Sequence, residues 1–507
     1  MIRPILTVST ATLASRLLGF IRDAMVAALL GAGPVADAFL VAFQLVNVIR
    51  RLLSEGALNA ALVPAWLRVR DTAGAGAAAA FAGRVLGTVS VAMIVVTAII
   101  GLIMPLVITA LAPGFVGRAT LQLAVDNARL MLPYLAFAGP VTVMMGLLNA
   151  QHRFALTAFS PLLFNLALIA VMAALLLHPF DSSTAALIMA GTIGVAGLLQ
   201  LLVLAWRRGD AMAVPLRMSF DAEMRGFLGK AVPGMVANSA PQLLIVAGAV
   251  LASTSPSAVS WLYFANRLIE LPLGIVGVAI GTVLVAELTR AVRGGDRAAV
   301  VAAESRGLEF AIGLALPAAL GLIVLSQPIV RLLFEHGAFT AADTAATAEA
   351  LALLGLGLPA HVLVKALSPA FFARDDTTTP LLATLVGLAV AVLAALLLQP
   401  RFGASGVAAS VALAAWCCAG VLALRGAVAF GFSIDAKARQ RLPLIALAAL
   451  AMGALLWLAR FVLAWTANAH GLVQAAVLGI LIAGGLVIYG MLLVLFGVIT
   501  KAGLRRH

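Results

Sequence analysis

The chain has 507 residues, of which 63% are hydrophobic and only 10% are charged, and its mean hydropathy is +1.13. No water-soluble globular domain of this length has such a composition, so the sequence predicts a polytopic membrane protein. The net charge of +13 does not indicate nucleic-acid binding, because lysine and arginine fall mostly in every second loop, as the orientation rule for membrane proteins requires.

Apolar runs long enough to cross a bilayer divide the chain into about fourteen helices with short connections, which leaves no room for a soluble domain. We expect spans at 5–30, 35–67, 80–111, 120–150, 157–178, 184–206, 227–252, 256–289, 307–334, 343–373, 378–399, 403–425, 441–464 and 471–498. The first run has no cleavage pattern and is expected to be a retained helix. On the cytoplasmic side we place both termini and the basic loops at Arg153, Arg208, Arg374 and Arg439.

A tandem repeat is indicated by two features that recur at an offset of about 220 residues. The loop 149–154 with Ser160-Pro161 resembles 372–376 with Thr379-Pro380, and Pro133 has the same relation to Pro359. We therefore expect two six-helix lobes, residues 1–220 and 221–430, with two further helices in 431–507. Substrate would bind between the lobes, and prolines inside the spans are either hinges or static kinks.

The sequence lacks the catalytic and metal-binding motifs that would indicate an enzyme. The adjacent Cys417 and Cys418 lie in an apolar run and read as packing residues, and the six histidines are scattered without metal-ligand spacing. No G-x-x-x-x-G-K phosphate loop occurs, and no loop supplies the acidic metal ligands that a polyprenyl-phosphate glycosyltransferase would need. The sequence therefore predicts a transporter without a cofactor.

Ionisable residues are concentrated between Ser15 and Glu55, inside runs that are otherwise apolar. A charged side chain at the bilayer centre costs about 2.5–3.5 kcal/mol on insertion scales, so these groups must face water, a partner or a ligand. Three more ionisable residues lie in later spans, Arg267 and Glu270 in the eighth and Lys365 in the tenth. The candidate substrate-binding residues are therefore Arg16, Arg22, Asp37, Arg50 and Arg267, and the candidate supporting residues are Asp23, Arg51, Glu55, Glu270 and Lys365.

Arginine rather than lysine dominates this set. A guanidinium matches a phosphate group with two parallel hydrogen bonds, so several arginines around one cavity favour a phosphate or diphosphate ligand. A structural alternative is open where spacing allows a same-helix ion pair, as for Arg51 with Glu55 and Arg267 with Glu270. Arg22 is expected to lack a same-helix partner at ideal spacing. Lys365 either joins the cavity or extends toward the membrane surface.

Several segments together carry a family resemblance. Residues 15–23, 31–39, 47–51, 55–57 and 63–64 resemble the N-terminal signature of the MurJ/MviN family, and 261–270 and 371–380 resemble its eighth helix and its tenth-to-eleventh loop. These proteins are lipid II flippases of peptidoglycan biosynthesis within the multidrug/oligosaccharidyl-lipid/polysaccharide exporter superfamily. The resemblance covers the whole chain and implies fourteen transmembrane helices in the bacterial inner membrane, with a role in cell wall biogenesis and cell shape.

The resemblance also implies a substrate and its site. The substrate would be lipid II, an undecaprenyl diphosphate-linked disaccharide-peptide, with membrane lipids and cell-wall synthesis proteins as partners. Essential cavity arginines of the family match Arg16, Arg22, Arg50 and Arg267, and Asp37 matches an acidic position. A groove leading to the last two helices would hold the polyprenyl tail. The alternative is a polysaccharide-lipid or drug exporter of the same superfamily, although a cationic drug would require cavity carboxylates.

The sequence departs from the family pattern at a few cavity positions. Gln44, Val46, Asn266 and Ala286 stand where lysine, proline, an acidic residue and proline are usual. Some members bind sodium through acidic and Asn ligands on helices seven and eleven. Here the eleventh span has no such residue, and the seventh offers only Asn238, Ser239 and Gln242. We therefore predict no sodium site and transport driven by the membrane potential.

Overall fold

The computed structural model describes residues 2–54, 57–178, 180–206, 217–219, 221–237, 240–279, 284–465 and 471–498. Across these ranges the regular secondary structure is helical, which confirms the predicted all-α membrane fold. Nine helical segments of the described chain are long and apolar enough to cross a membrane. Each predicted span coincides with one helix, with part of a kinked helix or with two successive helices.

In the first half of the chain the helices are α1 (Ile2–Leu30), α2 (Pro34–Ser54), α3 (Ala57–Leu102), α4 (Met104–Leu111), the 3-10 helix η1 (Pro113–Phe115), α5 (Ala119–Met131), α6 (Pro133–Ala150), α7 (Phe154–Leu177), α8 (Ser182–Trp206), α9 (Ala222–Ala237) and α10 (Ala240–Ala252). The second half contains α11 (Ala258–Ala279), α12 (Val285–Arg293), α13 (Arg297–Val324), α14 (Ser326–Phe334), α15 (Ala341–Phe372), α16 (Thr378–Phe430), α17 (Ala436–Trp465) and α18 (Gly471–Leu495).

Glycines break the two longest helices. In α3, Gly74 has φ 84° and ψ 176°, and in α16, Gly403 has φ 54° and ψ −130°. Only glycine adopts such positive φ values without strain. The break at Gly403 falls at the predicted boundary between the spans 378–399 and 403–425. A Cβ on Gly406 would lie 2.7 Å from the carbonyl carbon of Leu398, so the chain turns back there with main-chain atoms in contact.

The predicted proline hinges differ from one another. Pro133 separates α5 from α6, whereas Pro161, Pro272 and Pro359 lie inside uninterrupted helices. A membrane helix tolerates an internal proline where neighbouring groups satisfy the freed carbonyl. The choice between hinge and static kink at those three positions stays open.

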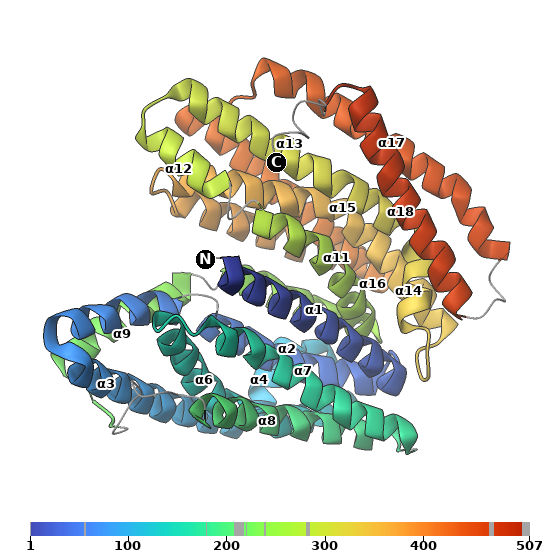
Figure 1. Cartoon of the computed structure of the whole chain (residues 1–507). Coiled ribbons are helices and arrows are strands. Elements are labelled where there is room, and N and C mark those ends of the chain that lie inside the picture. The colour runs from blue at the N-terminus through green and yellow to red at the C-terminus, as the bar shows by residue number, and fades with distance from the viewer. Residues whose placement is uncertain are drawn as a thin grey trace. The chain divides into compact units, whose positions relative to one another are not determined.

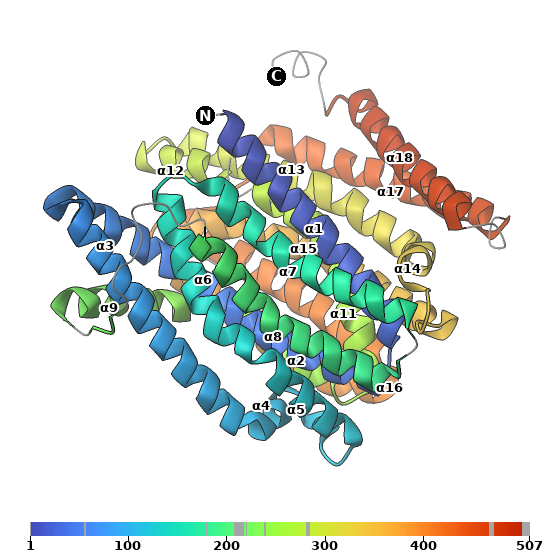
Figure 2. The ribbon, with the colours of Figure 1, turned by 60° about the horizontal axis from the view of Figure 1, so that its bottom comes forward.

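The chain divides into two compact units. Unit 1 is Met1–Ser260 with His336–Phe339, and unit 2 is Trp261–Glu335 with Thr340–His507. In unit 1, α1 packs along α7, α2 packs along α5, and α6 lies between α3 and α8 (Figures 1 and 2). Small residues allow close approaches of this kind: α8 also packs on α5, where a Cβ on Gly194 would lie 2.4 Å from the carbonyl oxygen of Leu130. The predicted lobe boundaries at residues 220 and 430 stay predictions.

In unit 2, α15 packs against α13 and α16, and α17 packs against α13 and α18 (Figure 1). The α15–α16 contact again depends on a small residue, because a Cβ on Gly357 would lie 2.8 Å from the Cα atom of Ala412. Helices α17 and α18 expose many large apolar side chains, including Leu450, Phe461, Leu486 and Met491. Such a surface requires a membrane around it.

Two glycines bring main-chain atoms together within unit 1. The amide of Ala338 donates a hydrogen bond to the carbonyl oxygen of Ala28 at 2.8 Å. Gly337 has φ +58°, and a Cβ there would lie 2.3 Å from that same oxygen. Gly31 has φ +64°, and a Cβ there would lie 2.5 Å from the carbonyl oxygen of Ala338. The segment 336–339 therefore rests directly on the link between α1 and α2.

Candidate functional site

Arg22 and Asp23 of α1 form a buried ion pair. The guanidinium donates from Nη2 to Asp23 Oδ1 at 2.6 Å and from Nε to the same oxygen at 3.0 Å. The two residues are 9% and 1% exposed. Arg22 was expected to lack a same-helix partner at ideal spacing, and its partner is indeed the adjacent residue, which the long arginine side chain reaches by folding back. Burial of both charges requires such pairing.

Asn165 of α7 completes this cluster and was missed by the sequence analysis. Its Oδ1 accepts from Arg22 Nη1 at 3.1 Å, and its Nδ2 donates to the carbonyl oxygen of Ser15 at 3.2 Å. The Arg22 guanidinium also lies 4.9 Å from the centroid of Phe43 and 5.9 Å from that of Phe164. A polar residue in an otherwise apolar span is the signal that would have found Asn165.

Arg16 and Arg50 occupy different surroundings. Arg16 is exposed on α1, and Arg50 is half-buried near the end of α2. The Nε and Nη2 atoms of Arg50 lie 3.4 Å from Oδ1 of the neutral Asn47. Neither arginine forms an ion pair with a described residue. Arg51 is half-buried, and its predicted partner Glu55 lies outside the described residues.

Asp37 is 3% exposed and caps a helix. Its Oδ1 accepts from the Ser260 amide at 2.9 Å and from the Ser260 hydroxyl. Ser260 lies in the first turn of α11, which begins inside unit 1 at Ala258. A carboxylate at this position satisfies amide groups that the helix leaves unpaired and complements its dipole. This geometry gives Asp37 a structural role, and its role in substrate binding stays a prediction.

Arg267, Glu270 and Lys365 belong to unit 2. Arg267 Nη1 lies 3.0 Å from Glu270 Oε2, and the two side chains are 23% and 32% exposed. Lys365 is exposed on α15, and its Nζ lies 3.5 Å from the carbonyl oxygen of Leu273. A Cβ on Gly277 would lie 2.9 Å from that Nζ, so the glycine leaves room for the ammonium group against α11. The cavity role of Lys365 stays a prediction.

Metal binding has no evident site in the part of the chain that the structure describes. No group of three or more His, Cys, Asp or Glu side chains there could hold an ion. Asn238 and Ser239, which the sequence analysis weighed as sodium ligands, lie outside the described residues. The absence of a sodium site stays a prediction.

The helical arrangement is similar to that of two solved membrane transporters. The inward-facing structure of a multidrug resistance MATE family transporter of the MOP superfamily superposes with a TM-score of 0.68 at 14% identity, over 87% of this chain and 98% of that one. A structure titled lipid II flippase MurJ, inward closed conformation, superposes with a TM-score of 0.77 at 23% identity, over 97% and 98% of the two chains. At these identities the likeness shows the fold.

Sequence comparison gives the family. The family model described as lipid II flippase MurJ matches residues 26–476. A probable lipid II flippase MurJ of Rhizobium meliloti is 38% identical over 90% of this chain and 86% of its own. The lipid II flippase MurJ of Burkholderia cenocepacia is 34% identical over 82% of this chain and 81% of its own. The chain therefore belongs to the MurJ lipid II flippase family, a family of multi-pass membrane transporters rather than enzymes, which confirms the resemblance noted in the sequence.

Proposed function

We propose that the protein moves lipid II from the cytoplasmic to the outer leaflet of the inner membrane by alternating access. Family membership over most of the chain supports the substrate. The site rests on one observation: Arg16 and Arg50 lie on helices α1 and α2, which are predicted to span the membrane, and neither forms an ion pair with a described residue. Because an uncompensated charge in the bilayer is costly, these groups require water or an anionic ligand.

The arginines divide into two roles in this proposal. Arg16, Arg50 and Arg267 bind the diphosphate, and Lys365 supports them. Arg22 is already neutralised by Asp23 and held by Asn165, so it fixes the shape of the α1–α7 contact and adds little net charge. The guanidinium groups suit a diphosphate because each can present two donors to one phosphate group.

The direction of transport follows from charge. An inside-negative potential favours outward movement of an anion by about 2.3 kcal/mol per charge per 100 mV. The sugar-peptide headgroup would pass through the cavity while the polyprenyl tail stays in the bilayer along the apolar surfaces of α17 and α18. Both termini would lie in the cytoplasm, and cell-wall synthesis proteins are the expected partners.

Complementation tests this function. A bacterial strain depleted of its own lipid II flippase should recover growth and expose lipid II on the outer leaflet when it expresses the wild-type chain. Arg16→Ala and Arg50→Ala should abolish recovery, and the matched control Arg68→Ala, a change at an exposed arginine of α3, should not. Failure of the well-expressed wild type would refute the function in favour of export of another polyprenyl-linked saccharide. Recovery by both cavity variants would refute only the site.

A further inference from the structure

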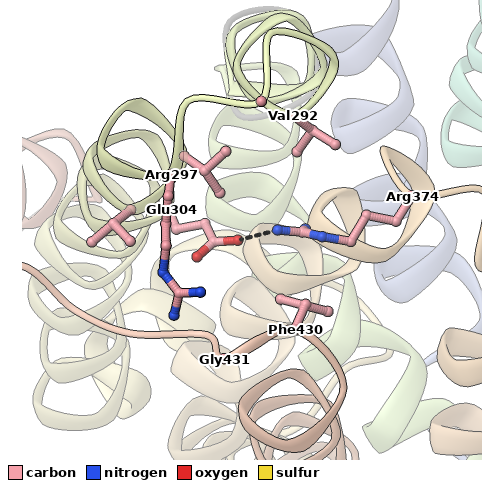
Figure 3. A pocket seen from close by; sticks show the side chains of 9 residues that line it. Val292, Arg297, Glu304, Arg374, Phe430 and Gly431 are labelled. Carbon is pink, nitrogen blue, oxygen red and sulfur yellow. Dashed lines mark hydrogen bonds and ion pairs between the residues drawn. The ribbon is translucent and has the colours of Figure 1, made fainter.

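A second arginine-containing pocket lies in unit 2, apart from the residues considered above (Figure 3). It has a volume of about 260 Å³ and lies between the link from α12 to α13, the turn after α15 and the end of α16. Its charged lining residues are Arg297, Glu304 and Arg374. Pockets for drug-sized ligands measure about 300–1,000 Å³, so this one suits a single small group.

Glu304 and Arg374 neutralise each other. Glu304 is 6% exposed, and its Oε1 accepts from Arg374 Nη2 at 3.4 Å. Arg374 Nη1 also donates to the carbonyl oxygen of Ala370 at 2.6 Å, and its guanidinium lies 3.8 Å from the centroid of the Phe430 ring. The guanidinium is thus fixed between the acid, the carbonyl and the aromatic face. This half of the pocket contributes no net charge.

Arg297 supplies the net positive charge of the pocket. Its guanidinium forms no hydrogen bond or ion pair with a described residue, and Figure 3 shows it beside Gly431, below the Glu304 carboxylate. Gly431 has φ +66°, and a Cβ there would lie 2.9 Å from Arg297 Nη2. The glycine that ends α16 therefore also makes room for this guanidinium. Arg297 is exposed and its charge also acts on Glu304, so its donors face both solvent and the hollow, where an anion could accept them.

We infer that this pocket binds a phosphate group, presented by the headgroup of an anionic phospholipid of the cytoplasmic leaflet. The Arg297 guanidinium would donate to the phosphate oxygens, while the Glu304–Arg374 pair closes the opposite wall. The segments around the pocket are predicted to be cytoplasmic, and the helices there carry basic residues, namely Arg290 and Arg293 of α12, Arg425 of α16, and Lys437 and Arg439 of α17. Anionic lipids of that leaflet are attracted to such clusters. The inference does not depend on which lipid-linked substrate is transported.

Native mass spectrometry of the full-length protein tests this site. The probe is phosphatidylglycerol added to protein in neutral detergent, with phosphatidylcholine as the reference lipid. We expect one tightly retained phosphatidylglycerol. Arg297→Gln, which removes the charge, and Val301→Phe, which fills the pocket without changing charge, should each weaken retention at least tenfold. Arg425→Gln, which removes an exposed charge on the same predicted face but outside the pocket, should change it less than threefold.

General attraction to basic loops predicts a different pattern. Equal weakening by Arg297→Gln and Arg425→Gln, or undiminished retention in Val301→Phe, would overturn the site. Thermal unfolding of each variant without lipid identifies any that fail to fold, and a variant with Arg297→Lys then tests the charge. A second measurement tests whether the pocket instead binds the phosphate group of a soluble compound: glycerol 3-phosphate is added to the protein in lipid-free detergent. An Arg297-dependent rise in unfolding temperature without phosphatidylglycerol retention would overturn the lipid as the occupant.

Discussion

The pair formed by Arg267 and Glu270 gives the sharpest test of the cavity. The two groups are 3.0 Å apart, three residues apart on one helix and partly exposed. Pairs of this kind contribute about 0.3–0.5 kcal/mol to stability, whereas a folded domain has about 5–15 kcal/mol. Loss of the pair therefore cannot unfold the protein. If Arg267→Ala abolishes lipid II transport while the amount of folded protein is unchanged, the cause lies in the substrate rather than in the fold.

We expect Arg267→Ala to stop lipid II exposure while the amount of folded protein in the membrane stays unchanged. Arg267→Lys should restore only part of the activity, because the two parallel donors are lost. The double variant Arg267→Ala with Glu270→Ala should stay inactive. Recovery of transport in the double variant would refute ligand binding, since it would show that the arginine only neutralises Glu270. Arg331→Ala, which removes a comparable pair with Glu335 at 3.4 Å, is the matched control and should retain activity.

Further expectations concern the buried pair, a glycine contact, topology and energy. Asp23→Ala leaves a neighbouring guanidinium buried without its acid and should cost about 3–5 kcal/mol in thermal unfolding, and a loss below 1 kcal/mol would contradict the buried pair. Gly114→Ala should cost about 1–3 kcal/mol, because its Cβ would lie 2.2 Å from a main-chain oxygen, whereas Gly76→Ala, with open space around it, should be tolerated; equal stability of both would argue against the contact. In a background without native cysteines, Arg153→Cys should resist an impermeant thiol reagent in intact cells and Ser255→Cys should react; the opposite pattern would invert the topology. Transport should stop when the membrane potential collapses and persist when potassium replaces sodium; dependence on sodium at constant potential would reveal a missed ion site.

Much of the helical order could be predicted from the sequence because a bilayer imposes a minimum apolar length on each span. The same length limit predicted that the apolar run 378–425 divides into two spans near residue 400. In the structure the division is the helix break at Gly403, which has a positive φ. Polar contacts between distant segments were not predictable. The contact of Asp37 with Ser260, for example, joins residues that are 223 positions apart in the sequence. Spacing on one helix says nothing about such a partner.

The Arg22–Asp23 contact shows a different limit of sequence reasoning. Helical spacing rules describe where Cβ atoms point, whereas a long side chain can fold back along its own helix. Asn165, which holds the same guanidinium from α7, had no periodic pattern to mark it. The sequence places Arg16 and Arg22 in one set of candidates, whereas the structure shows that Arg22 is paired with Asp23 and that Arg16 has no ion pair with a described residue.

The contact between residues 28–31 and 336–339 involves main-chain atoms, and its fit depends on two missing side chains. A survey of all single substitutions would therefore report Gly31 and Gly337 as highly intolerant positions. Intolerance of that kind is commonly taken as evidence for substrate contact. Here it would arise from steric exclusion alone, so even alanine should fail at both sites, while changes at the side chain of His336 should be accepted more readily. Mutational maps of this protein need that correction before intolerant positions are assigned to the transport pathway.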